Sequence, residues 1–270
     1  MRITIFNKLF TGLSLVLLTA AANATPIQGT SLQSGLNSIT QGGAFYDVNT
    51  NQYQPDEVWE LTAFGGSFST LLFEISAFAN SSTFGIYDIN DPNNKLQLFD
   101  GAASTGDQRL LYLDSGNVFN VLSFIDGPLG SATFSSTLFG YYIDSSNGGT
   151  NTAGGVFYSQ SSLNTNLGGG NGGSTDHMVA FRGNDVLQID TDGPGGNGYG
   201  LFHSGEFILA FEDLNYNTAN SSDFDFSDMV IMVESVLPVP VPEPAPLTLL
   251  GFGLLGLGIL GARRKKAVAA

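Results

Sequence analysis

The sequence predicts an all-β protein: one domain of the β-sandwich or jelly-roll type over residues 25–240, with an N-terminal signal peptide before it and one C-terminal transmembrane helix after it. Apolar residues recur with period two in short runs that are rich in Phe, Tyr, Val, Ile and Thr. Gly, Asn, Asp and Ser separate these runs, and no run after residue 43 keeps helical spacing. Many short strands divided by turn residues are typical of β-sandwiches and jelly rolls.

The expected strands follow the alternating runs in chain order. Phe207–Phe211 and Met229–Val233 are apolar almost without interruption, so we expect both faces of each to be buried in the middle of a sheet. The full set of expected strands is Ala44–Val48, Glu57–Ala63, Ser67–Ala79, Thr83–Ile89, Lys95–Phe99, Gln108–Leu113, Val118–Ile125, Ala132–Ile143, Gly155–Ser159, His177–Phe181, Val186–Ile189, Glu206–Phe211 and Met229–Val236.

Two of these strands carry the same pattern, Phe-Gly-x-Tyr, at Phe84–Tyr87 and Phe139–Tyr142. Glycine inside a strand marks a bulge or a close approach of another chain segment, and we interpret both glycines in this structural sense. Gly- and Asn-rich loops are expected near 145–173 and 191–200. They interrupt one domain, because the short strands between them are too small to bury a core alone.

The first 24 residues have the composition of a secretory signal peptide. Arg2 and Lys8 give a basic start, an apolar stretch covers Leu9–Ala22, and Ala22 and Ala24 form the small-x-small pattern that signal peptidase cleaves. The mature chain is therefore expected to begin at Thr25.

The last thirty residues, 241–270, combine three features in strict order. Pro242, Glu243 and Pro244 come first, and an uncharged apolar run, Leu247–Ala262, follows. Sixteen residues of helix span about 24 Å, which is short for a hydrocarbon core of about 30 Å. Four cations complete the tail and are expected to stay cytoplasmic: Arg263, Arg264, Lys265 and Lys266.

This order resembles the PEP-CTERM sorting signal of exported proteins in Gram-negative bacteria. The resemblance implies recognition and cleavage by the membrane protease-transpeptidase exosortase, so that the helix is a transient inner-membrane intermediate and the protein reaches the cell surface or extracellular matrix. A permanent C-terminal anchor is the alternative.

The processed chain is strongly acidic. Between Thr25 and Pro242 the nine basic residues of the whole chain fall to Lys95, Arg109 and Arg182, while the 24 acids fall to 23. Three minus 23 gives a net charge of −20, which argues against nucleic acid as a partner. Cysteine is absent, so neither disulfides nor zinc-thiolate sites contribute.

The densest group of acids follows one buried strand and precedes the next. If these strands form a hairpin, their flanking acids meet, and no Lys or Arg lies nearby in sequence to pair with them. Hard oxygen ligands suit calcium, and a solvated acidic turn is the alternative. An EF-hand is excluded because Asp228 stands where its loop requires glycine. The predicted ligands are Glu212, Asp213, Asp223, Asp225, Ser227 and Asp228.

The same stretch resembles the bacterial domain of unknown function 4114, whose signature runs F-E-D-L, a loop, then D-x-D-[FY]-N-D before an apolar strand. The matching segments here are Phe211–Leu214 and Asp223–Asp228, with Ser227 in place of asparagine. The resemblance implies an extracellular β-rich module and a divalent cation, but no reaction. Two further acidic turns, Asp88–Asn94 and Asp190–Gly193, are interpreted first as Asx turns.

Enzyme motifs are missing from the sequence. There is no G-x-S-x-G or H-E-x-x-H, and only His177 and His203 are available as histidine bases. We therefore expect a non-enzymatic surface or matrix protein of an exopolysaccharide-producing bacterium. A carbohydrate-binding module that contacts extracellular polysaccharide is the alternative, and a glycan hydrolase is a third reading. The candidate stacking rings of a carbohydrate site are Tyr53, Trp59, Tyr141, Tyr142 and Tyr158, although their placement in strands indicates that most of them are core.

Overall fold

The computed structural model of the chain describes residues 24–62, 66–76, 78–147, 149–150, 153–164, 176–193, 195–196, 198–215 and 222–240. Most of the predicted signal peptide, including Ala22, and the predicted sorting tail lie outside these residues. Within the described part of the chain, no helix is long and apolar enough to cross a bilayer. The predicted transmembrane helix, Leu247–Ala262, lies outside that part.

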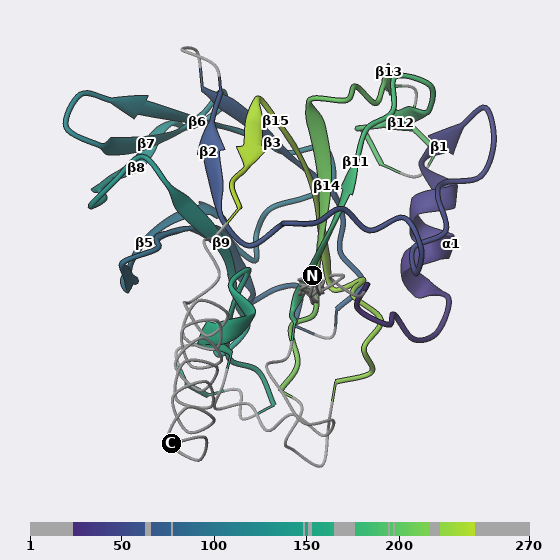
Figure 1. Cartoon of the computed structure of the whole chain (residues 1–270), viewed down its shortest axis with the longest axis horizontal. Helices are drawn as coiled ribbons and strands as arrows, with labels where there is room; N and C mark the ends of the chain where they lie inside the picture. Colours follow the sequence, from purple (N-terminus) through teal and green to yellow (C-terminus); the bar gives the residue numbers. More distant parts are fainter. Residues whose placement is uncertain are drawn as a thin grey trace, which may run out of the picture.

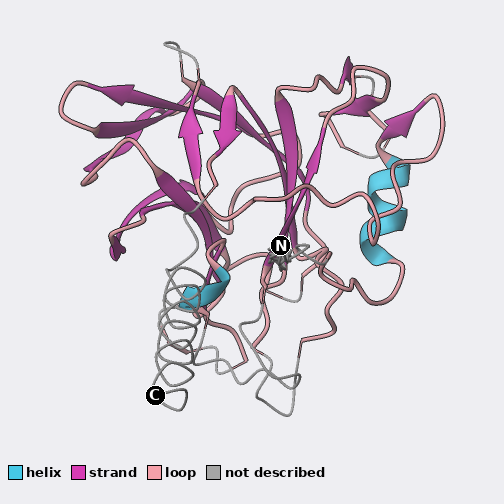
Figure 2. Cartoon of the chain, in the orientation of Figure 1, coloured by secondary structure: helices cyan, strands magenta, loops and turns pink. Residues whose placement is uncertain are grey.

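The described chain is built mainly from antiparallel strands, which confirms the all-β prediction (Figures 1 and 2). One α-helix and one 3-10 turn accompany them. In chain order the elements are α1 (Ser31–Ser38), β1 (Thr40–Gln41), β2 (Trp59–Leu61), β3 (Ser67–Phe73), β4 (Thr83–Asp88), β5 (Asp91–Phe99), β6 (Gln108–Asp114), β7 (Val118–Ser123), β8 (Gly127–Thr133), β9 (Phe139–Asp144), β10 (Val156–Tyr158), η1 (Ser161–Leu163), β11 (Met178–Arg182), β12 (Gln188–Asp190), β13 (Tyr199–Leu201), β14 (Glu206–Phe211), β15 (Met229–Glu234) and β16 (Val236–Pro238).

Two large sheets pack face to face in a sandwich-like arrangement. The seven-stranded sheet has the order β11-β14-β15-β3-β6-β7-β8, and the six-stranded sheet has the order β16-β2-β9-β4-β5, with β10 beside β9. Aromatic rings fill the space between the sheets: Trp59 meets Tyr141 and Phe207 edge to face, at 5.7 and 5.0 Å between ring centroids. Edge-to-face contacts of this kind add to the free energy gained by burying the rings.

A second, smaller core covers the opposite face of the seven-stranded sheet. It lies beneath α1 and the small sheet β1-β12-β13, which stand at the right of Figure 1. Leu32 and Leu36, one helical turn apart, are the buried residues of α1. The sequence patterns did not predict this helix. Eight residues with no side-chain N-cap are too short to be stable alone, so packing of the two leucines holds the helix.

Strands β14 and β15 lie between these two cores. All six residues of β14 are buried, with alternate side chains entering opposite cores: Phe207 and Leu209 in the larger core, Ile208 and Ala210 in the smaller. The two strands pair antiparallel, with Phe211 opposite Met229. The predictions of a hairpin and of a mid-sheet position for both strands are therefore confirmed.

The two Phe-Gly-x-Tyr motifs pair with each other in the antiparallel strands β4 and β9. Gly85 lies opposite Tyr142, and Gly140 lies opposite Tyr87. A Cβ at Gly140 would stand 2.3 Å from the Tyr87 ring, and one at Gly85 would stand 2.2 Å from the Leu96 carbonyl oxygen. Each glycine thus leaves room for a close approach, as predicted, and the ladder between β4 and β5 shifts register at Gly85.

Several predicted strand bounds are wrong. Ala44–Val48 is not a strand, because side chains of α1 accept the backbone hydrogen bonds that a neighbouring strand would accept. Phe45 N donates to Asn37 Oδ1 at 2.9 Å, and Val48 N donates to Gln33 Oε1 at 3.1 Å. Phe45 and Val48 are instead both buried in the smaller core, although residues three apart would point to opposite faces of a strand. The predicted strand Ala132–Ile143 is two strands, β8 and β9, joined by a turn. Finally, β13 lies partly inside the Gly-rich stretch that was expected to be loop.

Candidate metal site at the loop between β14 and β15

The acids singled out in the sequence flank the hairpin of β14 and β15. Glu212 and Asp213 directly follow β14, and the segment from Asp223 to Asp228 leads into β15. The pairing of Phe211 with Met229 brings these two segments side by side, at the yellow-green loop ends near the bottom of Figure 1. A hairpin buried on both faces thus fixes where the acids stand.

Three of the six predicted ligands come together. One carboxylate oxygen each of Glu212, Asp225 and Asp228 lies within 4.8 Å of the other two. Calcium binds oxygen at about 2.3–2.6 Å, so oxygens around one ion are separated by at most about 5 Å. The three side chains therefore fit a single calcium ion with all-oxygen coordination.

The buried oxygen of Glu212 is the least satisfied atom of the group. The residue has no exposed surface, and Oε2 has no hydrogen-bond partner among the described residues, whereas Oε1 accepts from Leu214 N at 3.2 Å. Burial, followed by the charge of Asp223, raises the pKa of Glu212. Burial and the charges of Asp213 and Glu212 raise the pKa of Asp228 still further. Without a cation, these carboxyls favour their protonated forms.

The other three predicted ligands stand beside the trio and support it. Asp213 donates its backbone N–H to Asp228 Oδ2 at 2.8 Å, and its own Oδ2 accepts from the Ser76 hydroxyl at 2.5 Å. Ser227 donates both its N–H and its hydroxyl to Asp225 Oδ1, each at 2.8 Å. Asp223 is exposed and acts on its neighbours through charge. These contacts orient Asp225 and Asp228.

The loop itself holds two bulky residues in the left-handed region, Phe224 at φ 58° and Phe226 at φ 53°. A non-glycine residue of this size rarely adopts positive φ, so surrounding contacts must hold the backbone there. Burial of the Phe226 side chain in the smaller core and a 2.8 Å bond from Gln28 N to the Phe224 carbonyl supply those contacts. Asp225 therefore lies between two anchored aromatic residues.

The connection between β3 and β4 adds groups that the sequence did not single out as ligands. Glu74 comes just after β3, its Oε1 is buried without a hydrogen-bond partner among the described residues, and burial with the charge of Asp213 raises its pKa to about 8. Ser76 and Ser82 donate to the Asp213 carboxylate. The position of Glu74, directly after an apolar run, could have marked it as a candidate ligand. No local pattern, however, indicated that it would meet the loop between β14 and β15.

His177 lies directly behind the acidic group. Its Nδ1 is 3.0 Å from the Glu212 carbonyl oxygen, and its ring stacks on Phe157 with 4.0 Å between centroids. Burial lowers the pKa of His177 to about 4. The imidazole is therefore neutral near pH 7 and does not offset the acids.

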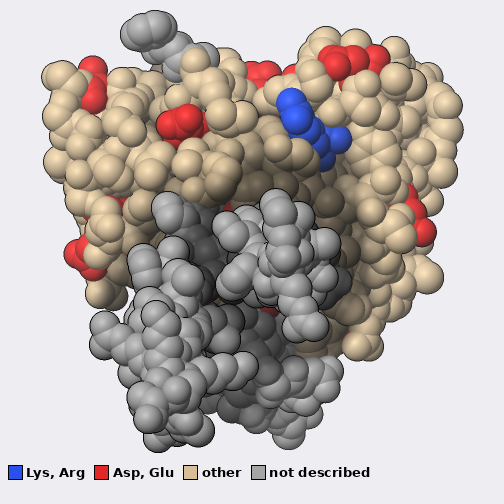
Figure 3. All heavy atoms as spheres, in the orientation of Figure 1, with Lys and Arg blue, Asp and Glu red and all other residues tan. Residues whose placement is uncertain are grey.

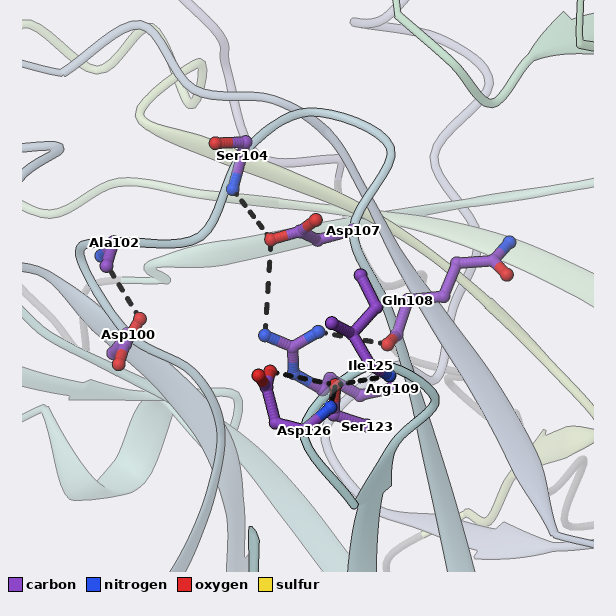
Figure 4. A network of polar contacts seen from close by, with 9 residues as sticks. All are labelled: Asp100, Ala102, Ser104, Asp107, Gln108, Arg109, Ser123, Ile125 and Asp126. Carbon is purple, nitrogen blue, oxygen red and sulfur yellow. Dashed lines mark hydrogen bonds and ion pairs between the residues drawn. The ribbon is translucent and has the colours of Figure 1, made fainter. Parts of the chain in front are cut away.

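A separate groove of about 580 Å³ opens between β5, β6 and the hairpin of β7 and β8. Figure 4 shows its polar wall, where the Arg109 guanidinium faces Asp107 at 4.0 Å and donates to the Gln108 carbonyl at 3.0 Å. Arg109 Nε is buried with no hydrogen-bond partner among the described residues, and the guanidinium lies over Phe99 at 5.2 Å from the ring centroid. Asp100 and Asp126 complete the wall.

The rings expected to stack on sugars are mostly core residues. Trp59 and Tyr141 are fully buried and Tyr142 is 4% exposed, because all three point between the sheets or against neighbouring strands. Tyr53 and Tyr158 are half-buried. Burial of the first three rings confirms the expectation that most of the rings belong to the core, and it leaves Tyr53 and Tyr158 as the candidates for stacking on a sugar.

Two acids and a histidine meet in a shallow hollow of about 350 Å³ lined by His203, Glu206 and Glu234. Glu206 and Glu234 are cross-strand partners, and Glu206 Oε2 accepts the His203 backbone N–H at 2.7 Å. The His203 ring is exposed and 3.2 Å from Asp185.

On the face drawn in Figure 3, acidic groups are spread over the surface and basic atoms form a small patch.

In a comparison with protein-family models, residues 240–265 match the family described as "PEP-CTERM protein-sorting motif". This match contains the Pro-Glu-Pro segment, the apolar run and the basic residues through Lys265. It confirms that part of the sequence analysis and indicates an exported protein that is processed by exosortase at the membrane and ends at the cell surface. Comparisons with curated proteins and with solved structures gave no match.

Proposed function

We propose that the protein is a non-enzymatic component of the cell surface or extracellular matrix, exported by its signal peptide, sorted by exosortase and stabilised by calcium. The β-rich domain is the delivered part, and its work is structural. The observation that carries the calcium proposal is the fully buried Glu212 Oε2, without a hydrogen-bond partner among the described residues, in a group where Glu212, Asp225 and Asp228 present oxygens within 4.8 Å of one another.

Electrostatics supports a bound cation over a solvated acidic turn. Glu212 is fully buried and Asp228 is 7% exposed, so water does not screen their mutual repulsion. Burying several anions together is costly unless a cation is shared among them. The two segments that carry these acids are also the ones that resemble the domain of unknown function 4114.

A calcium titration tests the proposal. Extracellular calcium modules bind with dissociation constants of about 10⁻⁴–10⁻³ M. At about 10⁻⁴ M, 10 mM calcium adds about 2.7 kcal/mol to the free energy of unfolding, which raises the Tm of a domain of this size by about 5–10 °C. The Tm of the exported chain should therefore be higher in calcium than in chelator, and Asp225→Ala should abolish the rise. Equal Tm values in calcium and chelator would refute calcium stabilisation.

The Arg109 groove favours a second candidate function, binding of a neutral saccharide. One arginine among Asp100, Asp107 and Asp126 offers both donors and acceptors, which suits hydroxyl groups, and the net negative wall disfavours acidic sugars. Phe124 and Ile125, at the adjoining turn, are 61% and 87% exposed. A glycan array probed with the exported chain and with Arg109→Ala tests this function. Binding that Arg109→Ala leaves unchanged, or no binding at all, excludes the groove.

The proposal of a non-enzymatic role is supported by what the histidines and acids already do. His177 is buried and stacked on Phe157, and Glu206 accepts the backbone N–H of His203. Incubation with the polysaccharide of the producing bacterium should release no sugar. Release that is lost in Glu206→Gln or Glu234→Gln would instead assign a hydrolase to the hollow at His203.

Export and sorting have their own test. In a strain without exosortase, the chain should keep its C-terminal tail and remain in the inner membrane. The mass of the surface form should fit a chain that begins at Thr25 and ends near Pro242–Pro244. A surface form of unchanged mass in the mutant strain would rule out exosortase processing.

A further inference from the structure

A second group of acids includes one residue, Asp176, that contacts the first residues of the described chain. Asp56, Glu57 and Asp176 act on one another electrostatically, and burial raises the pKa of both Asp56 and Asp176. Asp56 is 3% exposed, and its Oδ2 has no hydrogen-bond partner among the described residues. A buried carboxylate oxygen without a donor is costly, so this pocket favours a cationic donor.

Thr25 contacts one of these acids, Asp176, and also Gln52. Its hydroxyl donates to Asp176 Oδ2 at 2.7 Å, and its backbone N–H donates to Gln52 Oε1 at 2.7 Å. Gln52 Nε2 donates in return to the Thr25 carbonyl at 2.7 Å. Covalent geometry keeps the nitrogen of a threonine within about 4 Å of its own hydroxyl oxygen, so the Thr25 nitrogen stands close to the Asp176 carboxylate.

The processed chain has few other cations for this pocket. Its Lys and Arg residues are Lys95, Arg109 and Arg182. Each of the three lies over aromatic rings: Lys95 over Tyr142 and Tyr158, Arg109 over Phe99, and Arg182 over Tyr53 and Phe207. A new positive charge at Thr25 would therefore be a fourth cation in a domain of net charge −20.

We propose that the pocket of Asp56, Glu57 and Asp176 is a binding site for a primary ammonium group, and that its ligand is the α-ammonium of Thr25 formed when the signal peptide is cleaved after Ala24. This inference rests on the export step of the proposed function. As a peptide nitrogen, Thr25 has one hydrogen, which Gln52 already accepts. As an ammonium it has three, so two become available to the neighbouring Asp176 carboxylate and to the acids that act on it, and opposite charges favour each other in such a buried group.

Cleavage thereby connects to the candidate metal site. From Thr25 the chain passes Ile27, whose N–H donates to Asn49 Oδ1 at 2.8 Å, and reaches Gln28, whose N–H donates to the Phe224 carbonyl at 2.8 Å. Phe224 is one of the two left-handed residues in the acidic loop. Binding of the new N-terminus therefore fixes a segment that also braces the loop of Asp223–Asp228.

Two chains that differ only in their first residue test whether the pocket binds the α-ammonium of Thr25. One chain begins at Thr25 and one at Ala24, both end at Ala270, and both are held in the same detergent at pH 6.5. An α-amino group is charged there, since its usual pKa is about 7.7–8.0. The Thr25 chain should melt about 2–4 °C above the Ala24 chain, the shift expected for one buried charge pair in a domain of this size. Nα-acetylated Thr25 chain should match the Ala24 chain.

Substitutions assign the effect to the pocket. The difference between the two starts should vanish in Asp56→Asn and in Asp176→Asn, and should persist in Asp114→Asn, which changes an exposed acid on β6. If an Asn variant does not fold, Thr25→Val keeps the ammonium and removes only the hydroxyl, so it should retain most of the difference. Equal Tm values for the two starts, or a difference that both Asn variants retain, overturn the proposal.

The mass of the exported chain separates this inference from the export step. A mature chain that begins at Thr25 and shows no pocket effect refutes the pocket alone. A mature chain that begins elsewhere refutes the cleavage site, and with it the assigned ligand. The calcium response of the same samples reports on the metal proposal independently.

Discussion

Asp228 Oδ2 accepts the backbone N–H of Asp213 at 2.8 Å, and this bond joins the acidic segment after β14 to the acidic segment before β15. Both residues are buried, Asp213 completely and Asp228 to 7% exposure. The acids are thus held in place by backbone and serine donors, at the cost of repulsion among their carboxylates.

Glu212→Gln should have opposite effects with and without calcium. In chelator it should raise the free energy of unfolding by about 1 kcal/mol, because the parent must take up a proton to bury Glu212 uncharged, whereas glutamine is neutral in both states and its Nε2 can donate to a neighbouring carboxylate. In calcium it should lose the stabilisation that the parent gains, because a charged ligand is gone. Denaturant melts in both buffers measure this crossover. Asp114→Asn, the exposed control, should move neither curve, and a Glu212→Gln variant that still responds to calcium would exclude Glu212 as a ligand.

Stability in chelator should fall as the pH rises from 6.5 to 8. The raised pKa of Glu74, about 8, and the raised pKa values of Glu212 and Asp228 mean that the folded state holds protons which the unfolded state has already released. A state that binds more protons loses stability as the pH increases. His177, whose pKa is lowered in the folded state, opposes this trend only until its unfolded state has also released its proton, about one pH unit above its ordinary pKa.

Thermal melts across that pH range give the slope directly. With calcium present the slope should flatten or reverse, because the ion competes with protons for the same oxygens. A Tm that rises with pH in chelator would contradict the raised pKa values.

Gly140→Ala should destabilise the domain by several kcal/mol. A Cβ at this position would stand 2.3 Å from the Tyr87 ring, which is itself fully buried and has no room to move away. Gly205→Ala is the matched control, because nothing lies within 4 Å of its Cβ position. Urea unfolding of the two variants provides the comparison. A Gly140→Ala variant as stable as the control would show that the pairing with Tyr87 is loose.

Trp59→Ala should cost about 3–5 kcal/mol, as expected when a fully buried aromatic side chain is truncated. The variant loses the edge contacts with Tyr141 and Phe207 and the 2.7 Å bond from Nε1 to the Asp56 carbonyl. Circular dichroism melts measure the loss, with the exposed Ile125→Ala as a control that should not change. In the parent chain, Trp59 is the only tryptophan, so its fluorescence should shift to longer wavelength on unfolding.

The sequence contained enough information for the sandwich and for the hairpin that carries the candidate site. Period-two alternation reports directly which face of a strand is buried, and β14 and β15 are consecutive strands, so their pairing could be expected even though residues 212–228 lie between them. Glu212, Asp225 and Asp228 could be placed together for the same reason.

The parts of the fold and the site that were not predicted depend on contacts between residues far apart in the sequence. Ser76 reaches Asp213 across 137 positions, and Thr25 reaches Asp176 across 151, and no local pattern marks such partners. The helix α1 has only eight residues, with two buried leucines, which is too short for a recognisable helical period. Its stability comes from packing against the smaller core. The segment Ala44–Val48 has the composition of a strand, yet α1 side chains take the hydrogen bonds that a neighbouring strand would need.

The last described strands determine how the domain would bear force. The chain leaves β15, which is bonded between β14 and β3, and crosses to β16, a strand of three residues bonded only to β2 at the edge of the other sheet. A pull on the C-terminal side of Pro238 reaches β16 first. Its few bonds peel off singly, whereas β15 must be sheared from two neighbours at once. In a protein tethered through that end, β16 would detach from β2 at low force, and the strands of the sandwich would remain paired.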